Sequence, residues 1–187
     1  MIRTFLILLL NSLSWPVAAG VLTIVGFNVE SDDASERVIA SQLEQSSGID
    51  LWGLSEVYHE GRWTSQLQEA AAVDEGSEFG AIAGATGGGN RNAILYRRDR
   101  LRLLGSEELT DVPARQSGAA PLVARFLLDG EQELMFAVVR LSDRESRRAE
   151  ESRRLAQWAA EQVLPIIAVG TFAFEVTEGH LRLDHPE

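Results

Sequence analysis

The sequence contains no cysteine and few basic residues for a chain of 187 residues. Without cysteine there are no disulfide bonds and no thiolate metal sites, and the redox compartment cannot be inferred. The 17 basic residues are outnumbered by 28 acidic ones, so the formal net charge is −11. A nonspecific nucleic-acid-binding protein needs a basic face, and we find no strong basic patch of that kind. A metal-dependent nuclease is not excluded, because such sites are themselves acidic.

Histidine is scarce as well, with only three residues in the chain. His59, His180 and His185 do not have the paired spacing of a zinc-binding helix, so we predict each to be a surface or loop residue.

The apolar segment at the start of the chain has the layout of a secretory signal peptide. Arg3 precedes the apolar run Phe5–Leu10, and residues 17–19 are small enough for a cleavage site. The run is too short for a membrane span, and Pro16 would interrupt a longer helix. We therefore expect residues 1–19 to be removed, leaving a secreted or periplasmic protein with no transmembrane helix. An uncleaved anchor and a buried N-terminal helix remain the alternatives.

The remaining residues, 20–187, are enough for a single domain with a sizeable core. Hydrophobic periodicity and turn residues divide this part of the chain into alternating helix-like and strand-like segments. The pattern predicts strands at 21–28, 49–54, 79–83, 93–97, 101–104, 122–128, 133–141 and 165–169, and helices between 33 and 48, at 62–73 and at 142–163. Strand–helix–strand units at both ends, with antiparallel hairpins between them, predict an α/β (α+β) fold of two packed sheets with outer helices.

The longest predicted helix, residues 142–163, has recognisable end signals and a buried stripe. Ser142 and Glu145 form a capping-box pattern at its start. Opposite charges four residues apart, such as Glu150 and Arg154, are suited to ion pairs along its exposed face. The stripe predicted to be buried against the core contains Leu155, Trp158, Ala159, Gln162 and Val163.

This helix leads into the segment Pro165–Val169, an unbroken apolar run that predicts a central strand buried on both faces. Gly170 ends the strand and allows the backbone to turn. Residues that follow such a strand lie at its carboxyl end, where sites form in open α/β sheets. The residues found there, Thr171 and Ala173, provide no charge, metal ligand or general base.

Glu56 and Asn28 are the candidate metal ligands. Each follows or closes a predicted buried strand, which would hold the side chain rigidly at the rim of a sheet. Mg²⁺ favours few protein ligands and several waters, so one carboxylate aided by one amide is a suitable donor set. An acidic residue after a strand is, on the other hand, commonly a solvated end-cap, and that alternative stays open.

Other polar groups are weaker candidates for anion binding. The run Gly87-Gly88-Gly89 has the flexibility to cradle phosphate but lacks the Lys-Ser/Thr ending of a P-loop, so a flexible hairpin loop is the favoured interpretation. The arginines at 97, 98, 100 and 102 are predicted to alternate on exposed strand faces. The arginines at 144, 147, 148, 153 and 154 are predicted to form a solvated helix face, with phosphate binding as the less favoured alternative.

Taken in order, five segments of the chain resemble the endonuclease/exonuclease/phosphatase superfamily. They are FNVES (27–31), LWGLSEV (51–57), GGGNRNAILYRRDRLRLL (87–104), FAVVRLSD (136–143) and LPIIAVGTFAF (164–174). The resemblance implies a four-layer α/β sandwich that hydrolyses phosphodiester or phosphomonoester bonds with Mg²⁺. It covers residues 21–176, and we expect the last part of the usual domain to be missing.

By this resemblance, Glu56 matches the principal metal-binding glutamate and Asn28 the asparagine beside the metal. Arg91 resembles a polar residue close to the substrate. The same resemblance makes a phosphate ester or a nucleic acid the expected partner and Mg²⁺ the expected cofactor.

Other positions depart from the family pattern. Arg140 stands where a histidine is expected, and Thr171 and Ala173 replace an aspartate that orients water and an asparagine that contacts phosphate. Asp184-His185 resembles the family's terminal motif only superficially, because too few residues separate it from position 172. The sequence therefore offers no confident catalytic residue. Arg140 could still hold phosphate bidentately, so it joins Arg91 as a candidate phosphate ligand.

Three hypotheses follow from this mixture of kept and lost residues. The first is a non-catalytic relative that at most binds a metal or a phosphorylated ligand. The second is a Mg²⁺-dependent phosphodiesterase or nuclease with weak or altered activity. The third is a truncated structural remnant with no site.

Overall fold

The structure, a computed structural model, describes residues 21–30, 34–58, 62–73, 76–112 and 118–172. Several sequence-based predictions concern residues outside these ranges. These are the signal peptide, the three histidines, Ala173 and the segment Asp184-His185.

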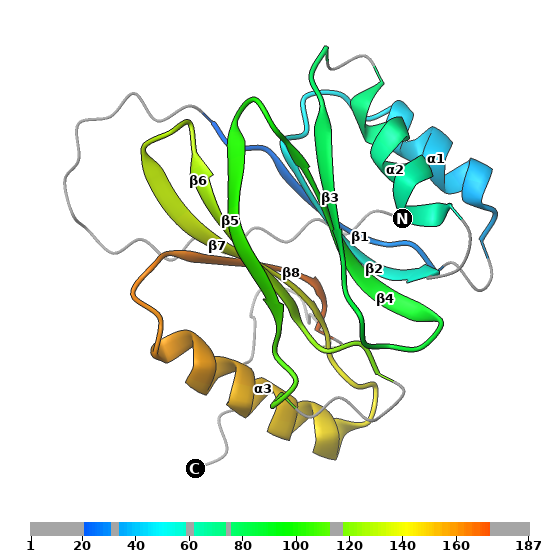
Figure 1. Ribbon diagram of the computed structural model, residues 1–187. Coiled ribbons are helices and arrows are strands. Elements are labelled where there is room, and N and C mark those ends of the chain that lie inside the picture. The colour runs from blue at the N-terminus through cyan, green and yellow to red at the C-terminus, as the bar shows by residue number, and fades with distance from the viewer. Residues whose placement is uncertain (1–20, 31–33, 59–61, 74–75, 113–117, 173–187) are drawn as a thin grey trace, which may run out of the picture.

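Two four-stranded sheets face each other and form the centre of the molecule (Figure 1). The first sheet has the order β1-β2-β4-β3 and the second β5-β6-β7-β8. The strands are β1 (Ile24–Asn28), β2 (Leu51–Tyr58), β3 (Phe79–Ala83), β4 (Asn90–Arg97), β5 (Leu101–Glu108), β6 (Leu122–Leu128), β7 (Gln132–Arg140) and β8 (Ile166–Thr171). Both sheets are mixed, because β1–β2 and β7–β8 pair in parallel while the other neighbours are antiparallel.

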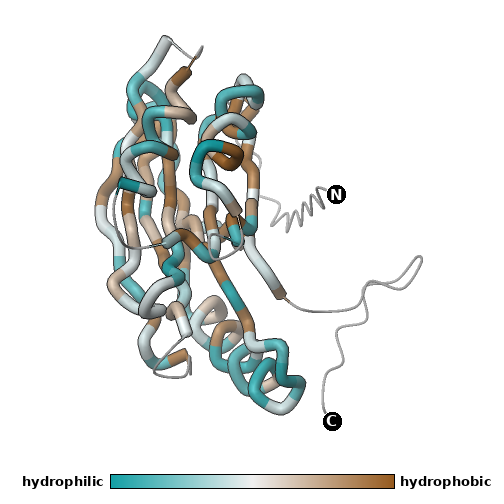
Figure 2. The backbone as a smooth tube through the Cα atoms, turned by 90° about the vertical axis from the view of Figure 1, so that its right-hand side faces the viewer, coloured by the Kyte–Doolittle hydropathy of each residue, from teal (hydrophilic) through white to brown (hydrophobic). Residues whose placement is uncertain are grey.

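Helices cover the outer faces of both sheets. Helices α1 (Glu36–Glu44) and α2 (Trp63–Ala72) pack on the first sheet, and α3 (Glu145–Ala160) packs on the second. In Figure 2, which views the layers from the side, α3 is the lowest helix and is largely hydrophilic. The four-layer α/β sandwich predicted from the sequence is confirmed. No helix within the described ranges is long and apolar enough to cross a membrane.

Three apolar clusters hold these layers together. They form because successive side chains along a strand point to opposite faces of its sheet. Leu54 and Leu95 point from the first sheet towards α1 and α2. Leu51 and Ile94, three and one residues away on the same strands, point towards the second sheet, where they meet Phe126. The third cluster, between the second sheet and α3, contains Val123, Met135, Ala137, Val139 and Leu141, with Leu155 and Trp158 packed against it.

The predicted burial of residues 165–169 on both faces is wrong. Within the described residues β8 is the last strand of its sheet, and its burial alternates so that Ala168 and Gly170 are exposed. The run is nevertheless apolar because its two faces meet different layers. Ile167 and Val169 pack between the sheets, whereas Ile166 packs on the side of α3.

The predicted start and stripe of the last helix also need correction. Ser142 and Glu145 do not form a capping box, because α3 begins later, with no side-chain hydrogen bond at its N-cap. The buried Glu151 instead reaches back and accepts a hydrogen bond of 2.7 Å from the backbone N–H of Ser142. Val163 lies beyond the end of the helix and is 98% exposed. The predicted Glu150–Arg154 ion pair is confirmed.

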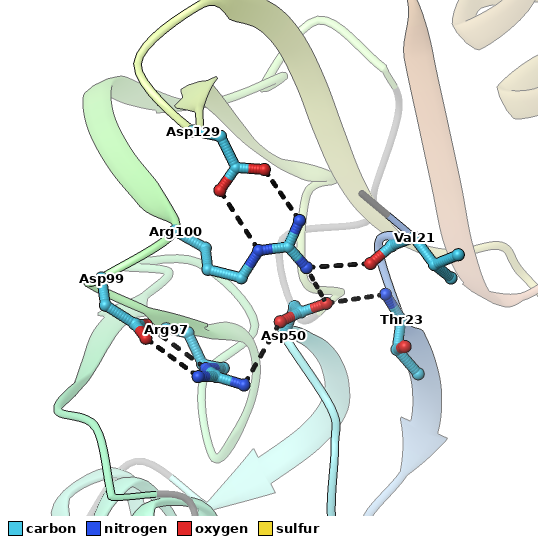
Figure 3. Close-up of polar contacts among 7 residues, drawn as sticks. All are labelled: Val21, Thr23, Asp50, Arg97, Asp99, Arg100 and Asp129. Carbon is cyan, nitrogen blue, oxygen red and sulfur yellow. Dashed lines mark hydrogen bonds and ion pairs between the residues drawn. The ribbon is translucent and has the colours of Figure 1, made fainter. Parts of the chain in front are cut away.

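A buried carboxylate ties the two sheets together at the end where β1 and β2 begin (Figure 3). The side chain of Asp50 is only 4% exposed. Its Oδ2 accepts hydrogen bonds from the backbone N–H of Thr23 at 2.9 Å and from Nη1 of Arg100 at 2.7 Å. Arg97 adds a longer ion pair, with its Nη1 3.6 Å from Oδ1 of the same carboxylate. Three segments distant in sequence therefore converge on one charge.

Arg100 extends this cluster to the β6–β7 turn, where Asp129 and Gly130 have positive φ angles and form the predicted hairpin turn. Its Nε and Nη2 donate to the two carboxylate oxygens of Asp129 at 3.2 and 2.8 Å. These hydrogen bonds hold the pKa of Asp129 below its ordinary value. The prediction that arginines 97 and 100 lie on exposed strand faces is thus wrong, since their side chains are 19 and 20% exposed and pair with acids.

Candidate functional site

The two sheets approach each other closely where glycines of the first sheet meet β8. A Cβ atom placed at Gly26 would lie 2.9 Å from the Cβ of Val169, and one at Gly53 would overlap the same valine side chain. Larger residues at these positions would therefore force the sheets apart. Because β1 and β2 pack this tightly on β8, side chains that follow these glycines on β1 and β2 can reach side chains of the second sheet.

Asn28 and Glu56 lie side by side where β1 ends, and β2 continues past Glu56 to Tyr58, beyond the predicted end of this strand at residue 54. The strands β1 and β2 run in parallel, with Asn28 paired to Ser55, so Glu56 follows directly at the rim. Nδ2 of Asn28 donates a hydrogen bond of 3.2 Å to Oε1 of Glu56. The other end of the amide, Oδ1, accepts from the Ser55 hydroxyl at 3.4 Å and from the backbone N–H of Glu30 at 3.3 Å.

A β-bulge sets the direction of the Glu56 side chain. Between Leu54 and Val57 the β2–β4 register shifts, so that Ser55 and Glu56 together face the single residue Asn92. Glu56 has a φ of +59°, a conformation that is uncommon outside glycine. Bulges and positive-φ residues cluster at functional sites because both redirect side chains at some cost in backbone strain. This geometry supports a role for Glu56 beyond that of a solvated end-cap.

Arg140 reaches the same carboxylate from the opposite sheet. It is the last residue of β7, where it pairs with Thr171 of β8. Its Nε lies 2.9 Å from Oε1 of Glu56, and the two side chains are 34 and 16% exposed. The structure therefore brings together three of the predicted site residues, Asn28, Glu56 and Arg140. Thr171 lies beside Arg140 and adds a hydroxyl group but no ionisable one.

These residues do not fit a divalent metal ion in the arrangement that the structure shows. Oε1 of Glu56 faces two nitrogen donors, Nε of Arg140 and Nδ2 of Asn28. A metal bound to this oxygen would lie next to the guanidinium charge, and close like charges repel strongly in a partly buried site. The described residues also contain no cluster of three or more His, Cys, Asp or Glu side chains able to hold a metal.

Arg91 is not brought into this cluster. It pairs with Val57 across the β2–β4 ladder, close to the rim, but its Nη1 donates to the carbonyl oxygen of Gly84 at 3.3 Å. Its Nε is buried without a hydrogen-bond partner. The side chain is therefore engaged with the β3–β4 loop, and a contact with phosphate at Arg91 stays a prediction.

Sequence reasoning missed the residue that organises this loop, Glu108 at the end of β5. Its carboxylate accepts hydrogen bonds from the backbone N–H groups of Ala85 and Thr86, at 2.9 and 3.1 Å, and from the Thr86 hydroxyl at 2.6 Å. The hydroxyl of Thr86 in turn accepts from the N–H of Ala120. The loop predicted as a flexible hairpin thus does cradle an anion, but the anion is a carboxylate of the protein itself.

The ionisation of Glu108 depends on this cradle. Burial raises the pKa of its carboxyl group, but the Thr86 hydroxyl, the two backbone N–H groups and the charge of Arg91 outweigh that effect. The pKa in the folded protein consequently lies below the ordinary value of 4.5. The sequence near Glu108 shows only an acidic residue at the end of a strand. Its role in binding the loop is not visible there, because its hydrogen-bond partners lie 22 and 23 residues earlier.

Glu108→Gln is expected to lower the free energy of unfolding near pH 7 by about 1.5–3 kcal/mol, the usual contribution of hydrogen bonds to a charged group. Because the folded-state pKa of Glu108 is depressed, its contribution is complete above the unfolded-state pKa and is lost as pH falls through the folded-state pKa. The difference between wild type and variant should therefore shrink below about pH 4.5. Urea unfolding across this range measures it.

The exposed neighbour Glu107 provides the matched control for this measurement. Glu107→Gln should change the unfolding free energy by less than about 0.5 kcal/mol at any of these pH values. A difference for Glu108→Gln that stays constant from neutral to acidic pH would show that its carboxylate charge is not what the loop binds.

Comparison with solved structures agrees with the fold implied by the sequence motifs. The chain is similar to D. rerio TDP2 in complex with a single-strand DNA product, with a TM-score of 0.68, 22% identity and coverage of 83% of this chain and 62% of that one. An endonuclease/exonuclease/phosphatase family protein from Bacteroides thetaiotaomicron gives a TM-score of 0.62, 24% identity and coverage of 81 and 63%. The corresponding values for an endonuclease/exonuclease/phosphatase from Bacteroides vulgatus are 0.60, 19%, 83% and 66%.

No protein-family model and no curated protein matches the sequence significantly. At these levels of identity the structural matches show the fold, so the chain has the endonuclease/exonuclease/phosphatase fold. It spans between 62 and 66% of the length of these three solved chains.

Proposed function

We propose that this chain binds a phosphate ester or nucleic acid at the rim formed by Asn28, Glu56 and Arg140, and that hydrolysis at this rim is lost or severely weakened. The observation that carries the proposal is the ion pair between Arg140 and Glu56, with Nε 2.9 Å from Oε1. Through this ion pair, the carboxylate that would otherwise hold a metal ion already has a positive partner from the protein. The predicted signal peptide adds the proposal that the protein acts after export.

The chemistry of the rim supports binding over turnover. Phosphoryl transfer needs a positioned nucleophile and groups that stabilise the charge developing in the transition state. Arg140 suits the second task, since a guanidinium binds phosphate oxygens well, but a guanidinium only donates hydrogen bonds and offers no general base. Thr171, its neighbour across the β7–β8 pair, has no ionisable side chain with which to activate water.

The ligand class follows from the fold and from one structural relative. The solved structure of D. rerio TDP2 contains a single-strand DNA product. A phosphodiester is therefore the first ligand to test on this chain. The net charge of −11 argues that binding would depend on local arginines, because the molecule as a whole repels polyanions.

The purified wild-type chain is expected to hydrolyse a chromogenic phosphodiester or a single-stranded oligonucleotide with Mg²⁺ no faster than its Glu56→Ala variant. Loss of one transition-state group commonly lowers the rate on the order of 10²–10³-fold, and several such groups are replaced here. Initial rates with Mg²⁺ and with EDTA provide the comparison.

The exposed Glu107 again offers a control, since Glu107→Ala removes one acid without touching the rim. Metal-dependent turnover that Glu56→Ala abolishes and Glu107→Ala leaves unchanged would overturn the proposed loss of catalysis. That result would establish the alternative, an active Mg²⁺-dependent phosphodiesterase.

A further inference from the structure

The guanidinium of Arg140 occupies a position next to Glu56 that a cation would take. Its Nε lies 2.9 Å from Oε1, and the carboxylate it pairs with is 16% exposed. A partly buried carboxylate requires a positive partner or hydrogen bonds to remain charged. Asn28 supplies one hydrogen bond and Arg140 supplies the charge. Glu56 is thus satisfied by groups of the protein alone.

Backbone pairing makes this cation a fixed part of the site. Arg140 ends a strand that pairs with β6 on one side and β8 on the other, and the next residue, Leu141, donates its N–H to the carbonyl oxygen of Thr171 at 2.9 Å. The backbone at Arg140 therefore cannot move away without loss of sheet hydrogen bonds. Glu56 is equally constrained by its bulge between β1 and β4.

The Arg140 side chain is only partly buried, so a ligand in solvent can reach it. Nε is the atom that lies 2.9 Å from Oε1 of Glu56. The Arg140 side chain as a whole is 34% exposed, so part of it is accessible from solvent. A guanidinium is suited to bidentate contact with phosphate oxygens.

We propose that Arg140 permanently replaces the divalent cation at Glu56, so that the rim excludes divalent metals and contacts an anionic ligand directly through the guanidinium. Loss of the guanidinium charge should convert the same residues into a divalent-metal site formed by Glu56 and Asn28. The anion contact rests on the function proposed above, whereas metal exclusion does not.

The test measures Mn²⁺ binding by titration calorimetry and by the paramagnetic resonance signal of free Mn²⁺. Wild type and Arg140→Lys, which keeps a cation, are expected to show no site at Glu56. Arg140→Gln, which keeps side-chain length but removes the charge, is expected to bind Mn²⁺ at least about tenfold more tightly, because a close like charge is gone. The double variant Glu56→Gln/Arg140→Gln should lose that binding again.

Thermal unfolding provides a readout that does not depend on assigning a binding heat. Arg140→Gln leaves Glu56 without its cation and should melt below wild type in EDTA. Added Mn²⁺ should raise its melting temperature, because a ligand that binds only the folded state stabilises it. Wild type should show no such rise. Comparable Mn²⁺ binding by wild type and Arg140→Gln, or a metal-dependent rise in both, would overturn the proposal.

The anion contact is tested separately with a fluorescent single-stranded oligonucleotide. Binding to wild type should be equal in Mg²⁺ and in EDTA, and Arg140→Gln in EDTA should weaken it by at least about tenfold. Failure of the oligonucleotide to bind wild type, together with metal binding confined to Arg140→Gln, would contradict the proposed function and still support replacement of the cation. Oligonucleotide binding that requires Mg²⁺ would overturn the replacement itself.

Discussion

Arg100→Ala is expected to lower the free energy of unfolding by about 3–5 kcal/mol, the range measured when one partner of a buried ion pair is removed. The variant leaves the Asp50 carboxylate, 4% exposed, with one hydrogen bond from Thr23 and a longer contact to Arg97. It also removes both hydrogen bonds to Asp129. Such a loss is a large share of the 5–15 kcal/mol that stabilises typical domains. Urea unfolding at neutral pH provides the measurement.

Arg98 is the matched control, because it lies two residues from Arg100 and its side chain forms an exposed ion pair. Its Nη1 is 3.5 Å from Oε2 of Glu78, and the two side chains are 55 and 85% exposed. Arg98→Ala should therefore change the unfolding free energy by at most about 1 kcal/mol. Equal effects of the two substitutions would show that the Asp50 cluster does not hold the sheets together.

A second comparison separates the buried charge from lost packing. In the double variant Asp50→Asn/Arg100→Ala the uncompensated carboxylate is gone, although the contacts of the arginine stem are still missing. Part of the loss seen in Arg100→Ala should be recovered, because an unpaired buried charge is more destabilising than an amide in its place. A double variant less stable than Arg100→Ala would assign the effect to packing instead.

The order and type of the elements could be predicted from local pattern. Apolar alternation and the Asp129-Gly130 turn depend on neighbouring residues, so these features are visible along the chain. The errors arise where distant segments decide the outcome. The burial of Ala168 depends on the position of β8 at the end of its sheet, and the start of α3 depends on Glu151, which binds Ser142 across nine positions.

The same distinction between local pattern and contacts of distant segments applies to the candidate site. Asn28 and Glu56 could be selected because the sequence predicts each at the end of a strand, and ends of parallel neighbours meet, although β2 continues past Glu56 to Tyr58. The bulge at Glu56 could not, since it arises from its pairing with β4. The contact between Arg140 and Glu56 depends on how closely two sheets pack, which no local pattern encodes. Family resemblance indicated that position 140 is unusual, but the geometry indicates what its guanidinium does.

Gly170→Ala is expected to lower the free energy of unfolding by about 3 kcal/mol or more, since backbone strain and a steric overlap add at one residue. Gly170 has a φ of +131°, a conformation that residues with a side chain rarely adopt. A Cβ atom there would also overlap the carbonyl oxygen of Val139 on β7. Relief of that overlap requires β8 to move away from β7, next to the pairing of Arg140 with Thr171. Urea unfolding tests the change in stability.

The control is Gly105→Ala, which places the same methyl group on a strand of the same sheet. A Cβ atom added at Gly105 would meet no atom within 4 Å, and the φ angle of this glycine is not positive. Its substitution should leave stability unchanged or raise it by up to about 1 kcal/mol through the unfolded state. Because Gly170 holds β8 against β7, its substitution should also weaken binding at Arg140, whereas Gly105→Ala should not. A Gly170→Ala variant as stable as Gly105→Ala would mean that β8 can shift freely, and the fixed position of Arg140 beside Glu56 would then need another cause.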